Sequence, residues 1–251
     1  MKSDFFAMSG QSNMQGQSES YVPFEAPASA CREYKILSDR FETVNNPSGE
    51  DVRVNGEELL LGAHQGFSSP VPYFADEFYK ISGFDATYAH VAKGATIVKQ
   101  WLPGTNRYNM LIEKLSKALK KAEDEGIEIV SKNFVWLQGE SDAIENNTRV
   151  QYKKELIDLW EHLKKDLGFE KFMMIRVGYF YEFPCERIML AQEELCRERD
   201  DFYMLTDVTA SFTIENGLMQ RLDQAGFHYT NKGYEVVGRE AGAAAARILH
   251  G

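Results

Sequence analysis

The chain of 251 residues carries a formal net charge of −10 at pH 7, and 43% of its residues are hydrophobic. This length is enough to bury a substantial core, and an acidic chain without a basic run is not expected to bind nucleic acid or an anionic membrane surface. Three widely spaced cysteines without a Cys-x-x-Cys pair argue against a disulfide framework and against a metal site. No stretch reaches the ~18 apolar residues of a membrane span, and a strand-like segment begins at Phe5, so a cytoplasmic protein is expected.

Short apolar segments and helical repeats alternate along the chain. Buried strands are predicted at residues 5–8, 87–92, 133–137, 172–177 and 202–206. Helices are predicted over residues 111–122, over 152–163, from Pro184 onward and over 231–249. This alternation predicts an α/β fold with a parallel sheet covered on both faces.

The stretch from about residue 15 to 85 does not follow the alternation. It is long and rich in turn signals, such as Asn45-Asn46-Pro47-Ser48-Gly49. We interpret it as an elaborated first crossover that shapes a binding face. The chain shows no internal repeat and no linker, so a single domain over residues 1–251 is expected.

Polar residues follow the first two predicted strands, and ligand sites in such folds lie beyond the carboxyl ends of the strands. Ser12 comes directly after the first strand, within Gly10-Gln11-Ser12-Asn13-Met14. Its hydroxyl is either exposed at the sheet edge or simply caps a helix. Gly94 follows the second strand, where its N–H either reaches a ligand or belongs to an ordinary turn.

Two further candidates lie later in the chain. The third strand runs into Gln138-Gly139-Glu140, which places an amide and a carboxylate at the same edge or else forms a turn and an acidic helix start. His228 precedes the last helix on a glycine-containing loop, where it is either a general base or a structural histidine. Each motif alone is ambiguous.

The four motifs occur together and in a recognisable order. They are Gly-Gln-Ser-Asn-Met at Ser12, Ala-x-Gly-x-Thr at Gly94, Gln-Gly-Glu-Ser-Asp at Gln138 and His-x-Thr-x-x-Gly-Tyr at His228. Together they resemble the SGNH-hydrolase superfamily, and more narrowly the branch with sialate O-acetylesterases and acetylxylan esterases, the sixth carbohydrate-esterase family. The resemblance extends from Phe5 to about residue 237. Members usually carry a second glycine where this chain has Ala95.

The resemblance implies a flavodoxin-like three-layer sandwich with a five-stranded parallel sheet. It also implies a serine esterase that removes O-acetyl groups from carbohydrates, with no cofactor and no metal. Ser12 would be the nucleophile and His228 the general base. The oxyanion would be held by the backbone N–H groups of Ser12 and Gly94 and by the side-chain amide of Gln138.

The acid of the triad is less clear from the sequence. Most members of the superfamily carry an Asp three residues before the catalytic His, but this chain has Ala225 there. Glu140 lies at a strand end on the catalytic edge, and Asp223 lies five residues before His228. We favour Glu140, with Asp223 as the alternative.

Two other functions stay open. A lipid esterase or thioesterase of the same superfamily would need a longer apolar acyl pocket, and a catalytically inactive sugar-binding module would have no use for Ser12 and His228. The expected partner is therefore an acetylated carbohydrate, such as a xylo-oligosaccharide, a sialic acid or a similar sugar. No residue pattern points to a particular oligomeric state.

Overall fold

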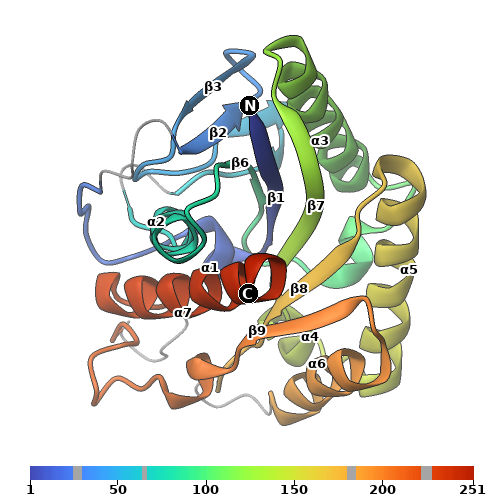
Figure 1. Ribbon diagram of the computed structural model, residues 1–251. Coiled ribbons are helices and arrows are strands. Elements are labelled where there is room, and N and C mark those ends of the chain that lie inside the picture. Colours follow the sequence, from blue (N-terminus) through green and yellow to red (C-terminus); the bar gives the residue numbers. More distant parts are fainter. Residues whose placement is uncertain (25–29, 64–66, 180–184, 222–227) are drawn as a thin grey trace.

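A seven-stranded sheet forms the centre of the molecule (Figure 1). From one edge to the other, its strands are β3 (Arg40–Thr43), β2 (Cys31–Lys35), β6 (Ala86–Ala92), β1 (Lys2–Gly10), β7 (Glu128–Leu137), β8 (Lys171–Ile175) and β9 (Phe202–Thr206). The computed structural model describes residues 1–24, 30–63, 67–179, 185–221 and 228–251. All neighbouring strands pair in parallel, except that the edge strand β3 runs antiparallel to β2.

Helices cover both faces of this sheet (Figure 1). Two of them, α2 (Val71–Ser82) and α7 (Asn231–His250), pack against each other on one face, and the other face carries α3 (Asn106–Asp124), α5 (Arg149–Leu167) and α6 (Glu186–Glu198). Shorter elements are α1 (Ser12–Gln15), α4 (Glu140–Ile144), the 3-10 helices η2 (Val98–Trp101) and η3 (Val208–Ser211), and a hairpin of β4 (Val52–Val54) and β5 (Glu57–Leu60). In the described ranges, no helix is both long and apolar enough to cross a membrane.

Local sequence explains where the main helices begin. The hydroxyl of Thr105 accepts a hydrogen bond from the backbone N–H of Tyr108 and caps α3. Thr148 and Thr230 cap α5 and α7 in the same way. Because Thr230 caps α7, His228 lies two residues before the start of this long helix.

The α/β class and the layered arrangement predicted from the sequence are confirmed, but the expected number of five strands is wrong. The two additional strands, β2 and β3, come from the long crossover. Their sequences, Cys-Arg-Glu-Tyr-Lys and Arg-Phe-Glu-Thr, mix charged and apolar residues; β3 is the partly exposed edge strand, and β2 lies between it and β6. The predicted helix start at Pro184 lies outside the described residues, and α6 begins at Glu186.

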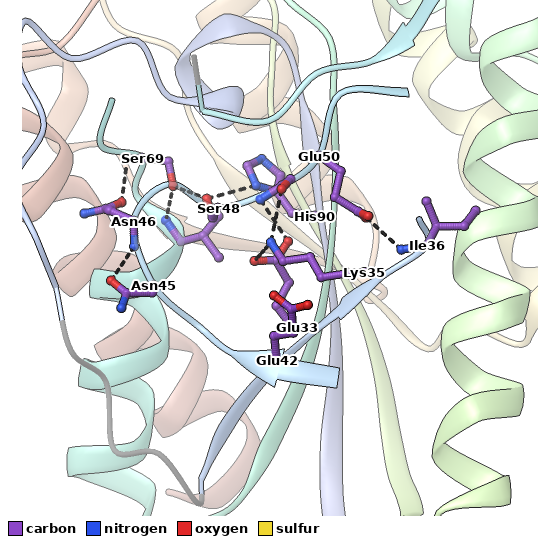
Figure 2. Close-up of polar contacts among 12 residues, drawn as sticks. Glu33, Lys35, Ile36, Glu42, Asn45, Asn46, Ser48, Glu50, Ser69 and His90 are labelled. Carbon is purple, nitrogen blue, oxygen red and sulfur yellow. Dashed lines mark hydrogen bonds and ion pairs between the residues drawn. The ribbon is translucent and has the colours of Figure 1, made fainter. Parts of the chain in front are cut away.

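The crossover rests on a buried group of charged side chains (Figure 2). The carboxylate of Glu50 accepts hydrogen bonds from Nζ of Lys114 on α3, at 2.6 Å, and from the backbone N–H of Ile36, at 2.8 Å. Glu33 of β2 pairs with Lys35 at 2.8 Å. We call Glu33, Lys35, Glu50 and Lys114 the charged cluster. Its two acids match its two bases, which limits the cost of burying them.

A buried histidine lies beside the charged cluster. Nδ1 of His90, on β6, lies 3.0 Å from Oγ of Ser48, which in turn hydrogen bonds to Oγ of Ser69 (Figure 2). Burial lowers the pKa of His90 to about 3, and the positive charges of Lys114 and Lys35 contribute to this shift. His90 is therefore neutral at physiological pH, and it links the crossover to the centre of the sheet.

Candidate active site

Ser12 is placed by a sharp turn between β1 and α1. Gly10 adopts a φ of 146°, and a β-carbon on it would lie 2.0 Å from the carbonyl oxygen of Leu137. Only glycine therefore fits where the chain leaves β1. Ser12 is the first residue of α1, so its N–H has no intrahelical acceptor, and no described residue accepts a hydrogen bond from it. This N–H is available to a ligand.

A pocket of about 350 Å³ opens over Ser12 at the carboxyl ends of β1, β6 and β7. Its lining contains Gln11, Ser12, Gln15, Gln17, Leu61, Lys93, Gly94, Ala95, Ser141, Ile144 and His228. The fold thus brings Ser12, Gly94 and His228 to one pocket, although they come from three distant parts of the chain. The lining does not include Gln138 or Glu140.

His228 is half-buried at this pocket. Its carbonyl oxygen accepts a hydrogen bond from the backbone N–H of Gln220, at 2.9 Å, which fixes the loop just before α7. Burial lowers the pKa of the His228 imidazole to about 4, so the ring is neutral at physiological pH. No carboxylate among the described residues forms an ion pair with it.

The two candidate acids differ in what can be said of them. Glu140 is buried, and its Oε1 accepts a hydrogen bond from Nδ2 of Asn13 at 2.7 Å. Its Oε2 has no hydrogen-bond partner in the described part of the chain. Burial raises the pKa of Glu140, while the bond from Asn13 opposes this shift. The alternative acid, Asp223, lies outside the described residues.

A chain of buried hydrogen bonds extends from Glu140 through α1, which carries Ser12, to α7. Besides donating to Glu140, Asn13 accepts a hydrogen bond from the hydroxyl of Tyr234 at 3.1 Å. The same hydroxyl oxygen accepts the backbone N–H of Gln17, also at 3.1 Å. We call Glu140, Asn13 and Tyr234 the positioning chain. It fixes α1, which carries Ser12, against α4 and against the helix that follows His228.

Gly94 lies very close to Ser12. A β-carbon on Gly94 would be 3.3 Å from Cβ of Ser12 and 3.2 Å from Oε1 of Gln15, so a larger residue would crowd Ser12. The N–H of Gly94 donates to Oε1 of Gln15 at 3.1 Å. A substrate oxygen would have to replace this acceptor.

The amide of Gln138 is fully buried and engaged within the protein. Its Nε2 donates to the carbonyl oxygen of Thr96, at 2.8 Å, and to the carboxylate of Asp142. These two bonds use both protons of the amide. Burial raises the pKa of Asp142 to about 6, although Gln138 and Asn147 donate to it. As the structure stands, Gln138 holds the loop after β6 against α4.

The residue after Gly94 has a backbone conformation that favours glycine. Ala95 adopts a φ of 57°, in the left-handed region that glycine reaches without penalty. A side chain at this position therefore strains the backbone at the edge of the pocket.

Sequence reasoning missed several lining residues, of which Gln17 is the most informative. Its backbone N–H donates to the hydroxyl of Tyr234 and its carbonyl oxygen accepts a hydrogen bond from Nε2 of Gln220, so the backbone of Gln17 is fixed by two hydrogen bonds. Its side-chain amide forms no hydrogen bond with the described residues and faces the pocket. The position of Gln17 just after the Ser12 motif was the one available signal. Leu61 and Ile144 carried none, because tertiary packing alone places them there.

A second depression, of about 670 Å³, lies at the opposite end of the sheet, between the end of α3 and the start of β7. Its lining, which includes Lys120, Glu123, Glu128 and Lys132, contains neither a serine nor a histidine. Within the described ranges, no group of three or more His, Cys, Asp or Glu side chains is arranged to hold a metal ion. The pocket over Ser12 is therefore the candidate active site.

The mostly parallel sheet with helices on both faces is the SGNH-hydrolase type of fold, and solved structures share it. The structure of NanS matches with a TM-score of 0.70 and 12% identity over 98% of this chain and 97% of that chain. A protein from Arabidopsis thaliana matches with a TM-score of 0.69 and 20% identity over 99% of both chains. A carbohydrate acetylesterase from Xanthomonas citri matches with a TM-score of 0.56 and 17% identity over 98% of this chain and 56% of its own.

Sequence comparison defines the family. The family model described as carbohydrate esterase, sialic acid-specific acetylesterase matches residues 2–247. A probable carbohydrate esterase from Arabidopsis thaliana is 26% identical over 188 residues, which are 69% of this chain and 67% of that protein. The chain belongs to this carbohydrate esterase family, and it is a carboxylic-ester hydrolase.

Proposed function

We propose that the protein is a serine esterase that removes O-acetyl groups from a carbohydrate through an acetyl-enzyme, with Ser12 as nucleophile and His228 as general base. One observation carries this proposal: Ser12 and a neutral His228 line the same pocket of about 350 Å³. Membership of a carbohydrate esterase family supports the same reaction.

The two residues divide the chemistry as follows. Neutral His228 takes the hydroxyl proton of Ser12 while the oxygen attacks the acetyl carbonyl carbon, and a tetrahedral oxyanion forms. When this intermediate collapses, the sugar oxygen leaves with the proton from the imidazolium. A water molecule then gives a proton to His228 and attacks the carbonyl carbon of the acetyl-enzyme. When this second intermediate collapses, the imidazolium returns the proton to Oγ of Ser12, and acetic acid is released and ionises.

The oxyanion needs donors that are already in place. The unengaged N–H of Ser12 is the first, and one such donor contributed about 2.7–4 kcal/mol in a measured protease. The N–H of Gly94 and the amide of Gln138 are the proposed second and third donors. Within the protein, the N–H of Gly94 donates to Gln15, and the amide of Gln138 donates to Thr96 and Asp142. Each donor therefore has to give up an internal hydrogen bond before it can bind the substrate oxygen.

Glu140 is the proposed acid behind His228, and Asp223 is the alternative. A carboxylate in this role holds the imidazole tautomer and stabilises the imidazolium. The unpartnered Oε2 of Glu140 is available for such a bond. The isosteric variants Glu140→Gln and Asp223→Asn separate the two, because loss of the acid lowered kcat about 10⁴-fold in a serine protease. A large loss in Asp223→Asn with a near-normal rate in Glu140→Gln would assign the role to Asp223.

The composition of the pocket supports an acetyl ester of a sugar over a long-chain ester. The amides of Gln11 and Gln17 and the hydroxyl of Ser141 can bind sugar hydroxyls. Leu61 and Ile144 provide a small apolar surface, which is enough for a methyl group. We expect kcat/KM to fall steeply from p-nitrophenyl acetate to butyrate and octanoate, and an equal value for octanoate would contradict this.

The decisive experiment measures acetate release from acetylated xylo-oligosaccharides, acetylated sialic acids and acetylated simple sugars. The Ser12→Ala variant is expected to lose the activity and also labelling by a fluorophosphonate probe. Ser141→Ala is the matched comparison, because Ser141 lines the same pocket, and it is expected to keep the label. Labelling of an active preparation at Ser141, or at no serine, would overturn the assignment of Ser12.

A further inference from the structure

A separate depression lies between the β4–β5 hairpin and the first turns of α3. Its volume is about 320 Å³, at the small end of the range for small-molecule sites. Leu59 and Met110, both buried, form its apolar floor. Amide and carboxylate side chains surround this floor, namely Asn55, Glu57, Asn106 and Asn109.

This depression adjoins the active site along the hairpin. Leu59 lines the depression, while Leu61, two residues later, lines the pocket over Ser12. Two residues of extended chain span about 7 Å. Between Glu57 and Leu59, the side chain of Glu58 lies 3.7 Å from Nζ of Lys93, another residue of the catalytic pocket. A ligand longer than one small molecule can therefore extend from one site to the other.

The hairpin and α3 are tied together at this point. Nδ2 of Asn106 donates to Glu57 at 2.9 Å, and Arg107 donates to the carbonyl oxygen of Glu58 at 3.1 Å. These bonds connect the hairpin to the start of α3. The depression is therefore held between two anchored elements.

The chemistry of the depression fits a neutral sugar unit. The side-chain amides of Asn55 and Asn109 form no hydrogen bonds within the described part of the chain, so each offers a donor and an acceptor. An apolar floor suits the C–H face of a sugar ring. Glu113 is paired with Lys117 at 2.7 Å, whereas the carboxylate of Glu57 forms no ion pair among the described residues, so Glu57 can accept a hydroxyl hydrogen bond and disfavours an anionic ligand.

We propose that this depression is an accessory sugar subsite. It binds a neighbouring, uncharged unit of an oligosaccharide or polysaccharide whose acetyl group lies at Ser12. The inference rests on the proposed function, and it narrows the substrate class to acetylated neutral saccharides of more than one unit.

Chain-length dependence tests the subsite. We expect the wild-type kcat/KM to be higher for acetylated xylo-oligosaccharides than for acetylated xylose. Asn109→Ala, at an exposed position, is expected to lower kcat/KM about two- to tenfold on the oligosaccharides, as for the loss of one hydrogen bond, and to leave the value for acetylated xylose unchanged. Ser116→Ala, on the same helix but outside the depression, is the matched control and should behave as wild type. Equal wild-type values for all lengths, or an equal loss on acetylated xylose, would overturn the subsite.

Direct binding separates this inference from the proposed reaction. Calorimetric titration of the Ser12→Ala variant with unacetylated xylotriose needs no catalysis. We expect binding that weakens about two- to tenfold when Asn109→Ala is added. If this holds while the wild-type protein releases no acetate from any sugar, the subsite stands and the proposed function fails. If acetate is released but xylotriose does not bind, or binds equally to both variants, the subsite is refuted.

Discussion

Replacing Tyr234 by Phe tests whether the positioning chain sets the geometry of the nucleophile. The change removes one oxygen and keeps the ring. It removes the hydrogen bond that the hydroxyl donates to Oδ1 of Asn13 and the one that it accepts from the backbone N–H of Gln17, each at 3.1 Å. Tyr234 is completely buried, so water does not easily replace the hydroxyl.

The expected loss of stability follows from these two hydrogen bonds. A buried polar group that loses a hydrogen bond costs about 1–3 kcal/mol, so for the two groups we expect the free energy of unfolding to fall by about 2–6 kcal/mol. Because Asn13 follows Ser12 within α1, the nucleophile also loses part of its orientation. A displacement of about 1 Å can cost 10²-fold in rate, so we expect kcat to fall between about tenfold and 10²-fold with KM little changed.

The assay pairs urea unfolding with kcat and KM on p-nitrophenyl acetate, and Tyr108→Phe provides the control. Tyr108 is also buried, and its hydroxyl donates to Asp166 at 2.6 Å, on α5 and outside the active-site lining. This variant is expected to lose stability but to keep its kcat. If both variants lower kcat equally, or if Tyr234→Phe leaves kcat unchanged, the positioning chain does not act on Ser12.

Three further predictions follow from strain and from titration. Ala95→Gly relieves a left-handed φ and should raise the free energy of unfolding by about 1 kcal/mol, and a loss of stability in urea unfolding would contradict the strain. The pKa of His90 is about 3 in the folded protein and about 6.5 in the unfolded chain, so its neutral form stabilises the fold above pH 6.5 and this contribution is lost as the pH falls. The difference in unfolding free energy between wild type and His90→Gln should therefore shrink by about 1.4 kcal/mol per pH unit between pH 6 and 4. A difference that stays constant with pH would refute this. Burial lowers the pKa of His228 to about 4, so kcat/KM should stay high down to about pH 5 and fall only as the imidazole gains a proton near pH 4; an acidic limb near the ordinary imidazole pKa of about 6.5 would contradict this.

The centre of the sheet was predictable because its strands are buried on both faces. Every residue of β6 is buried, and a continuous apolar run is the pattern that such a strand produces. β2 was not predictable in this way, since it contains Glu33, a fully buried carboxylate. Its partners are Lys35 and the backbone N–H of Gly49, and only the folded crossover brings the latter to it.

The candidate site likewise has a part that the sequence predicted and a part that it did not. Strand-end reasoning placed Ser12 and Gly94 on one edge, the loop before the last helix and the family resemblance added His228, and the structure brings all three to one pocket. Their chemical roles stay predictions. The bond between Asn13 and Glu140 joins residues 127 positions apart, and no local pattern in one sequence contains such a pairing. The engagement of Gln138 by Thr96 was equally invisible, because it depends on how two loops pack.

The charged cluster also determines how the wall of the pocket responds to ionic strength. Surface ion pairs weaken in salt, but counterions do not reach a pair such as Lys114 and Glu50, whose side chains are 0% and 8% exposed. The loop that Glu50 anchors leads directly into the β4–β5 hairpin and Leu61, which lines the pocket. Concentrated salt should therefore leave this wall in place while it dissociates the exposed pairs along α3, such as Lys120 with Asp124.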